Sequence, residues 1–139
     1  MDRTIRMDNT EIQHHQWKLE AYRDEAYQFL IRAQEEARTF DCDDPQDLGD
    51  CCVTSCFREF LFQQSSQKRQ LLQLIEDALR RIDNETFGEC IDCGGRINKK
   101  RLEAMPWIQY CLQCQKKLEQ VEKVELRESH PLESMHAAK

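Results

Sequence analysis

The sequence contains few of the residues that break helices. Its 139 residues include only four glycines and three prolines, whereas 33% are charged and 40% are apolar. That balance favours helix over sheet and does not suggest wholesale disorder. We therefore predict a mainly α protein, built as one domain or as one small domain with an extended appendage.

The chain also lacks an excess of positive charge and any long apolar run. Its formal net charge is −6, which argues against a general DNA-binding protein because phosphate contacts need surplus Lys and Arg. No stretch approaches the roughly 20 apolar residues that span a bilayer, and no apolar run follows the first residues to suggest a signal peptide. We expect a cytoplasmic protein, in which cysteines are more often metal ligands or free thiols than disulfides.

Two long segments without glycine or proline predict two long helices. Between residues 11 and 40, apolar residues recur in steps of three and four at Leu19, Tyr22, Ala26, Phe29, Ala33, Ala37 and Phe40. Between 51 and 82, a near-heptad seam is predicted at Val53, Phe57, Phe60, Gln64, Gln67, Leu71, Leu74, Ala78 and Ile82. Helices joined by a short loop pack antiparallel, and each arm would be on the order of 45 Å long. We predict a projecting coiled-coil hairpin over 11–83.

The rest of the chain divides around this hairpin. We expect a flexible N-terminus over 1–10, a zinc finger over 84–115, and a C-terminal helix with a frayed tail over 116–139, the helix itself running from about 112 to 127. His14, His15 and Trp17 are predicted on the first helix, the histidines at its surface and Trp17 packed or half-packed on it, whereas Trp107 is predicted in the finger core.

Four of the eight cysteines form two CxxC pairs separated by 17 residues, with the ligands Cys90, Cys93, Cys111 and Cys114. Each pair lets two sulfurs converge on one tetrahedral ion, and Gly94 after the first pair eases a tight turn. This spacing predicts one structural zinc site. Two disulfides or a redox CxxC are the competing interpretations. Four thiolates would close the coordination shell, so we expect no catalytic water, and the chain shows neither a catalytic triad nor a phosphate-binding glycine loop.

Basic residues lie between the two CxxC pairs, at Arg96, Lys99, Lys100 and Arg101. A tetrathiolate zinc site carries a formal charge near −2, which these residues can offset. A contact with nucleic acid or a polymerase is the equally weighted alternative.

The predicted hairpin loop carries the most concentrated charge of the chain, at Asp41, Asp43, Asp44, Asp47 and Asp50. Aspartate favours turns and helix caps, and Asp50 is placed to cap the second helix. The spacing does not match the calcium loop of an EF-hand. The functional interpretation is a rod that carries one or two carboxylates into a distant site.

The segment around the cysteines resembles the zinc-finger signature of the DksA/TraR transcription factors. The matching residues are Phe87-Gly88-Glu89-Cys90-Ile91-Asp92-Cys93-Gly94, Ile97, Arg101-Leu102-Glu103-Ala104 with Pro106, and Cys111 with Cys114. The resemblance implies a monomeric, non-enzymatic stringent-response regulator. Such a protein places its hairpin in the secondary channel of bacterial RNA polymerase without binding a DNA sequence itself.

The resemblance also implies an active tip with the pattern DxxDxA near the polymerase active site. Without gaps, that pattern falls on Asp47, Asp50 and Cys52, whereas a three-residue shift places it on Asp44, Asp47 and Gly49. We prefer the ungapped register because an insertion disturbs a coiled-coil seam. In either register the last position departs from the family's alanine.

The family's basic residues for the nucleotide ppGpp correspond here to Leu74, Met105 and Gln115. None of these side chains can pair with a phosphate, so we expect weak or absent ppGpp dependence. Alternative functions are a Gre-like transcript-cleavage factor whose tip carboxylates hold a metal, and a zinc-ribbon nucleic-acid-binding module. The remaining cysteines, Cys42, Cys51, Cys52 and Cys56, are predicted to be free thiols. The alternatives are a redox switch at the tip and a second metal site, which the adjacent Cys51 and Cys52 disfavour.

Overall fold

The computed structural model describes residues 7–39 and 48–129, and describes residues 48–52 and 125–129 by their backbone alone. Its helices are α1 (Asn9–Thr39), α2 (Leu48–Asp83), α3 (Lys99–Ala104) and α4 (Leu112–Ser129). The described ranges contain no strand, only an isolated antiparallel bridge between Glu89 and Arg96. No helix in these ranges combines the length and apolar character needed to cross a membrane.

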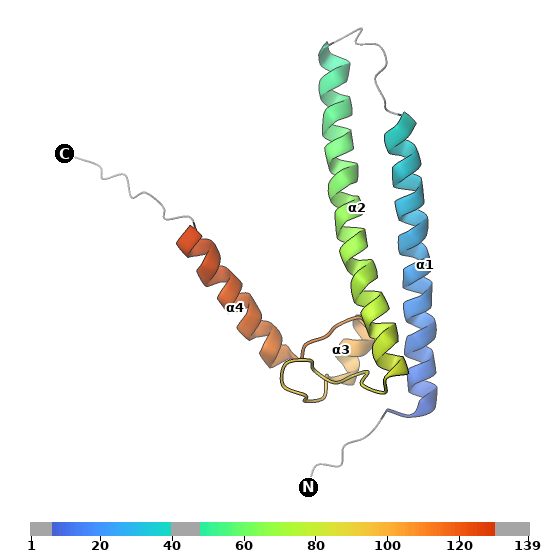
Figure 1. Cartoon of the computed structure of the whole chain (residues 1–139), viewed down its shortest axis with the longest axis vertical. Helices are drawn as coiled ribbons and strands as arrows, with labels where there is room; N and C mark the ends of the chain where they lie inside the picture. Colours follow the sequence, from blue (N-terminus) through green and yellow to red (C-terminus); the bar gives the residue numbers. More distant parts are fainter. Residues whose placement is uncertain (1–6, 40–47, 130–139) are drawn as a thin grey trace, which may run out of the picture.

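The two long helices form the predicted antiparallel hairpin. α1 has 31 residues and α2 has 36, which corresponds to about 46 Å and 54 Å of helix. Figure 1 shows the two helices side by side along their length, with the segment after α2 folded against their base and α4 projecting outward. The mainly α fold with a hairpin, a finger and a C-terminal helix is therefore confirmed.

The buried face of α1 follows the predicted spacing and contains one unexpected residue. Leu19, Ala26 and Ala33 are buried as expected. His15 is also buried, with 5% of its surface exposed, because it lies four residues before Leu19 on the same face. The prediction of a surface position for His15 was therefore wrong. Trp17 was also misplaced, since it lies off this face and is 68% exposed.

The buried face of α2 differs from the predicted seam at alternate layers. Leu61, Ile75 and Ala78 are buried, whereas the predicted Phe60 is 55% exposed and Leu74 is 36% exposed. The observed seam runs in steps of three and four through Leu61, Gln64, Lys68, Leu71, Ile75, Ala78 and Ile82. It shares Gln64, Leu71, Ala78 and Ile82 with the predicted seam. At the layers between these residues, the seam residue lies one position later in the sequence than predicted. Each of the layers at 60–61 and 74–75 offers two apolar neighbours, and packing against α1 buries the second.

The base of the hairpin and the finger share one core. Leu19 of α1 and Ile75 of α2 belong to the same buried cluster as Phe87, Ile97 and Leu102 of the finger. Trp107 packs edge-on against Tyr22 of α1, with ring centroids 5.0 Å apart and the planes at 84°. The prediction of a packed Trp107 is confirmed, and the finger is anchored on the hairpin.

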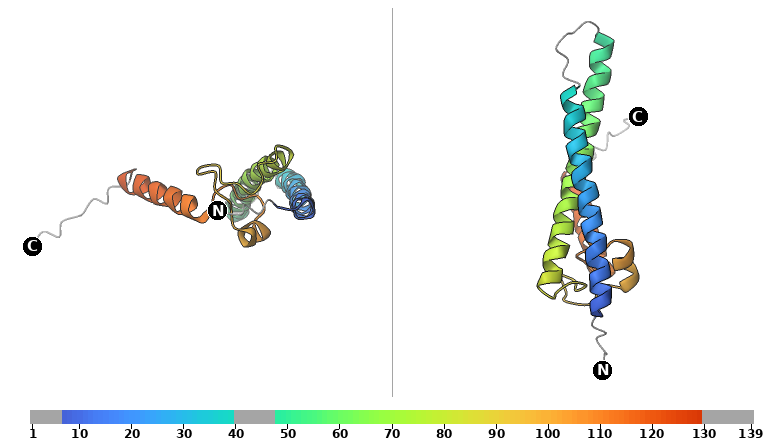
Figure 2. Two further views of the ribbon diagram at one scale, coloured as in Figure 1. Left: turned by 90° about the horizontal axis from the view of Figure 1, so that it is seen from below. Right: turned by 90° about the vertical axis from the view of Figure 1, so that its right-hand side faces the viewer.

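The C-terminal helix α4 leaves this core. Figures 1 and 2 show it projecting away from the hairpin on the side of α2. Leu118, Val121 and Val124 are 41%, 56% and 53% exposed, so its apolar stripe has no partner within the described residues.

Candidate metal centre

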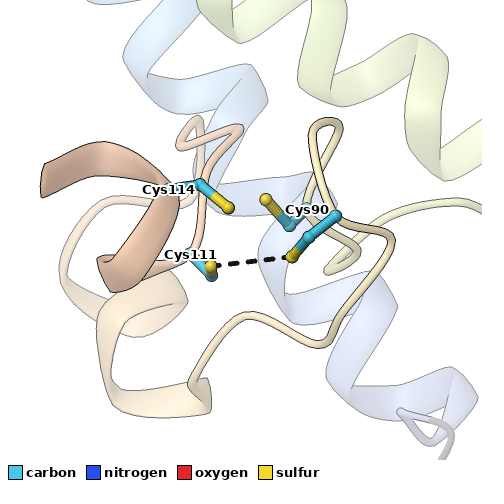
Figure 3. A group of neighbouring side chains, drawn as sticks. Cys90, Cys111 and Cys114 are labelled. Carbon is cyan, nitrogen blue, oxygen red and sulfur yellow. Dashed lines mark hydrogen bonds between the residues drawn. The ribbon is translucent and has the colours of Figure 1, made fainter. Parts of the chain in front are cut away.

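The four predicted ligands converge. The sulfur atoms of Cys90, Cys93, Cys111 and Cys114 all lie within 4.8 Å of one another, and the Sγ atoms of Cys93 and Cys111 are 3.8 Å apart. A zinc ion with Zn–S bonds of 2.3 Å and tetrahedral geometry separates its sulfurs by about 3.8 Å. In Figure 3 the side chains of Cys90, Cys111 and Cys114 point toward a common centre. The arrangement fits one structural zinc ion and is the one such ligand cluster among the described residues.

The first CxxC pair lies on a tight loop between α2 and α3. The backbone N–H of Cys90 donates to the carbonyl of Gly95 over 2.8 Å, and the N–H of Gly94 donates to the carbonyl of Cys90 over 2.9 Å. Gly94 has φ of +66°, a conformation that side chains with a Cβ disfavour. This turn folds Cys93 back toward Cys90, as the CxxC spacing predicted.

The second CxxC pair lies at the N-terminus of α4. The carbonyl of Cys111 accepts from the N–H of Gln115 over 2.9 Å, which begins the helix. Unpaired N–H groups and the helix dipole make this end of a helix favourable for negative charge. A hydrogen bond from the backbone N–H of Cys114 lowers the pKa of the Cys111 thiol, which favours the thiolate that a zinc ion requires.

The pKa values of the Cys90 and Cys114 thiols are shifted in opposite directions. Burial raises the pKa of the Cys90 thiol, but hydrogen bonds from the backbone of Cys111, Cys93 and Asp92 outweigh it and hold that pKa at about 6. The hydrogen bond from the Cys114 thiol to Asp92 raises the pKa of Cys114 above its ordinary value, and Cys111 adds to that shift. Binding of a metal ion must therefore displace a proton from Cys114, which makes zinc affinity fall at acidic pH.

The finger is also tied to the hairpin by polar contacts. The guanidinium of Arg81 on α2 donates to the carbonyls of Thr86 and Glu89, just before the first ligand. Gln109, just before the second pair, donates to the carboxylate of Asp77 over 3.2 Å. Both CxxC pairs are thereby fixed to the last turns of α2.

A short helix that the sequence reading missed joins the finger to α1. α3 begins after Asn98, whose side chain accepts from the N–H of Lys100 and caps the helix. Lys18 of α1 binds the carboxylate of Glu103 over 2.8 Å and its carbonyl over 2.7 Å. Asn98 preceding an apolar Leu102 was the available signal for this helix.

Three of the four basic residues between the ligands make polar contacts within the fold. Lys99 pairs with Glu11 over 2.7 Å, and Arg101 donates to the carbonyl of Tyr110 over 3.2 Å. Arg96 lies 3.8 Å from the carboxylate of Glu89. Lys100 makes no ion pair with a described residue. Charge compensation at the zinc site and a contact with nucleic acid or a polymerase both stay predictions for these residues.

The predicted tip residues lie at the edge of what the structure describes. Asp41, Cys42, Asp43, Asp44 and Asp47 fall outside the described residues. Gly49, Asp50, Cys51 and Cys52 belong to the first turns of α2, where only the backbone is described. Because α2 begins at Leu48, Asp50 lies inside the first turn, and the prediction that it caps the helix was wrong. Cys56 is exposed.

The three positions at which the family resemblance predicts nucleotide contacts carry no charge. Leu74 is 36% exposed on α2 and Met105 is 40% exposed after α3. Gln115, in the first turn of α4, donates to Glu119 over 3.1 Å. The side chains at these positions are thus two exposed apolar groups and an amide already bonded within its own helix.

Comparison with known proteins agrees with the site and the fold. Residues 85–120 match the family model described as the prokaryotic dksA/traR C4-type zinc finger. The RNA polymerase-binding transcription factor DksA of Salmonella typhimurium is 32% identical over 114 residues, covering 78% of this chain and 71% of its own, and DksA of Escherichia coli K12 matches to the same extent. The structure of transcription factor DksA2 from Pseudomonas aeruginosa shares the fold, with a TM-score of 0.74 and 23% identity over 88% of this chain and 93% of its own.

Proposed function

The chain belongs to the DksA/TraR family, and on that premise we propose that it is a non-enzymatic regulator of bacterial transcription initiation that binds RNA polymerase. The hairpin would enter the secondary channel of the polymerase. Its acidic tip, with Asp47 and Asp50 in the preferred register, would lie near the active site. The relatives that match over most of their length are named RNA polymerase-binding transcription factors.

The observation that carries the proposal is the continuous core between the finger and the hairpin. Leu19, Ile75 and Leu102 belong to one buried cluster although they come from α1, α2 and α3. A rod of 36 residues in α2 that rises from an anchored base can hold its tip at a set distance from a docking surface. The finger and α4 would form that docking surface, and the exposed stripe at Leu118, Val121 and Val124 is available for it.

We propose weak or absent dependence on ppGpp. Leu74 and Met105 offer no cation to a phosphate group, and Gln115 offers only an amide. The net charge of −6 adds no favourable background field for an anionic nucleotide.

The test is the lifetime of the open complex on a ribosomal promoter with the cognate polymerase. We expect the wild-type protein to shorten that lifetime and Asp50→Asn to bind polymerase equally well without shortening it. Asp83→Asn makes the same substitution at the other end of α2, where the side chain is exposed, and should act as wild type. Adding ppGpp should change the wild-type effect by less than about twofold, which is within roughly 0.5 kcal/mol of coupling.

Each alternative outcome has a clear meaning. Binding to polymerase with full activity in Asp50→Asn would reject this tip register and move attention to Asp44 and Asp47. A strong synergy with micromolar ppGpp would reject nucleotide independence. Absence of polymerase binding by the wild-type protein would reject the proposed function.

A further inference from the structure

The hairpin carries a groove on one side of its upper half that the finger does not cover. The groove has a volume of about 580 Å³ and lies between residues 30–37 of α1 and residues 55–69 of α2. Its floor includes Ala33 and Leu61, which are 5% and 7% exposed. Small alanine side chains on α1 leave this space open next to the seam.

The α2 rim of the groove combines guanidinium, aromatic and hydroxyl groups. Arg58, Phe62, Ser65 and Arg69 all line it, and their spacing of four, three and four residues puts them on one face of the helix. Phe62 is 65% exposed, so its ring is presented to solvent. Arg69 is exposed, and its guanidinium makes no ion pair or hydrogen bond with another described residue.

This set of side chains suits a strand of nucleotides. Guanidinium groups bind phosphate oxygens with directed hydrogen bonds, and exposed aromatic rings provide stacking surfaces for unpaired bases. The distance along α2 from Arg58 to Arg69 is about 16 Å, so the rim is long enough to meet more than one nucleotide. One carboxylate, Glu59, also lines the groove. Because a carboxylate repels phosphate groups, we expect an uncharged base of the strand, not a phosphate, to lie beside Glu59.

We propose that this groove binds single-stranded RNA through Phe62 and Arg69. The site is distinct from the tip and from the finger, and it needs no polymerase to form. Within the proposed function, a hairpin that reaches toward the active site would bring the groove close to the growing RNA strand. The overall charge of −6 opposes RNA elsewhere on the protein, so binding should be weak, local and strongly dependent on salt.

The experiment uses the full zinc-loaded chain and a fluorescently labelled twelve-nucleotide single-stranded RNA, followed by anisotropy at about 25 mM and 150 mM salt. We expect Phe62→Ala to weaken binding by about fivefold or more, since stacking on an aromatic ring contributes at least that much per base. Arg69→Gln should weaken binding at low salt and reduce the slope of affinity against salt by about one.

Matched controls lie on the same hairpin. Arg32→Gln removes an exposed arginine of α1 that does not line the groove, and Ile31→Ala removes a 55% exposed apolar side chain that also lies outside it. Both should bind RNA as the wild type does. Circular dichroism of all variants should be unchanged because each altered side chain is mostly exposed.

Three results would overturn the proposal. The first is that the wild-type protein does not bind RNA at low salt, and the second is that the groove variants and their controls lose affinity equally. The third is that the groove variants bind polymerase more weakly but bind RNA as the wild type does, which would make the groove a protein contact. Competition by ATP or GTP alone at matched phosphate concentration would show a mononucleotide site and reject the strand. Because polymerase is absent from the RNA assay, its outcome is independent of the proposed function.

Discussion

The base and the upper half of the hairpin are built differently. At the base, residues of α1, α2 and the finger share a buried cluster that includes Leu19, Ile75 and Leu102. Above Ala26, which is 1% exposed, burial is confined to Ala33 and Leu61 among the described residues, while large apolar side chains nearby stay exposed. Since stability follows buried apolar area, the base is the stable unit and the upper arm depends on it.

Removing a zinc ligand should cause the largest loss of stability among our predictions, because it removes the metal from the base of the hairpin. Cys114 is 3% exposed and belongs to both the ligand set and the core, so Cys114→Ser should abolish stoichiometric zinc binding and unfold the finger. We expect a loss of several kcal/mol and a melting temperature lower by roughly 10 °C or more. Zinc content by mass spectrometry and thermal unfolding by circular dichroism measure both.

Cys56→Ser is the matched control for this change. Cys56 is exposed on α2 in the upper half, and its loss should alter stability by no more than about 0.5 kcal/mol. If Cys114→Ser kept one zinc per chain, the four-cysteine assignment would be wrong.

Two neighbouring residues of α2 allow the buried seam to be tested at a single position. Ile75 is fully buried at the base, whereas Leu74 is 36% exposed. Ile75→Ala should therefore cost about 2–5 kcal/mol because it removes buried methyl groups and leaves a cavity, while Leu74→Ala should cost less than about 1 kcal/mol. Urea unfolding of both variants measures the difference, and a larger cost for Leu74→Ala than for Ile75→Ala would mean that the seam lies where the sequence alone had placed it.

The seam shows where sequence reasoning reaches its limit. The hydrophobic pattern of α2 has two solutions, because Phe60 and Leu61 are both apolar, as are Leu74 and Ile75. The spacing alone cannot choose between them, since both fit a near-heptad repeat. The partner surface decides, and that surface comes from α1 and a finger distant in sequence.

The zinc site, in contrast, could be read from the sequence completely. Its geometry is encoded in two short CxxC turns, each with its own glycine or helix N-terminus, so few long-range contacts are needed to form each half. The bounds of the long helices were also predicted to within three residues, because glycine and proline are absent from their interiors. α3 was missed because six residues are too short for a periodic signal.

His15 was missed for a related reason, since a search for apolar spacing passes over a polar residue in a buried seam. Its ring lies 5.5 Å from that of Phe87, at the junction between α1 and the finger, and its buried Nδ1 atom has no hydrogen-bond partner in the part of the chain that the structure describes. The neutral imidazole is thus accommodated mainly as an apolar ring.

The smallest effect that we predict concerns the pH dependence of this junction. Burial lowers the pKa of His15, and this outweighs the opposing influence of Glu103, with His14 and Lys18 lowering the pKa further and Glu11 raising it. The unfolded chain, in which a histidine has a pKa of about 6.5, then binds more protons than the folded one, so the free energy of unfolding falls as the pH drops through that value.

Urea unfolding of zinc-loaded protein at several pH values from about 7.5 to 5.5 should show a flatter dependence of the unfolding free energy on pH for His15→Gln than for wild type. His14→Gln changes a neighbouring exposed histidine and should retain the wild-type slope, and because zinc loss affects all three proteins alike, the difference between the two histidine variants isolates the buried ring. Identical slopes for both variants would mean that His15 is already hydrated at the junction, and that the base is less tightly packed there than the rest of its core.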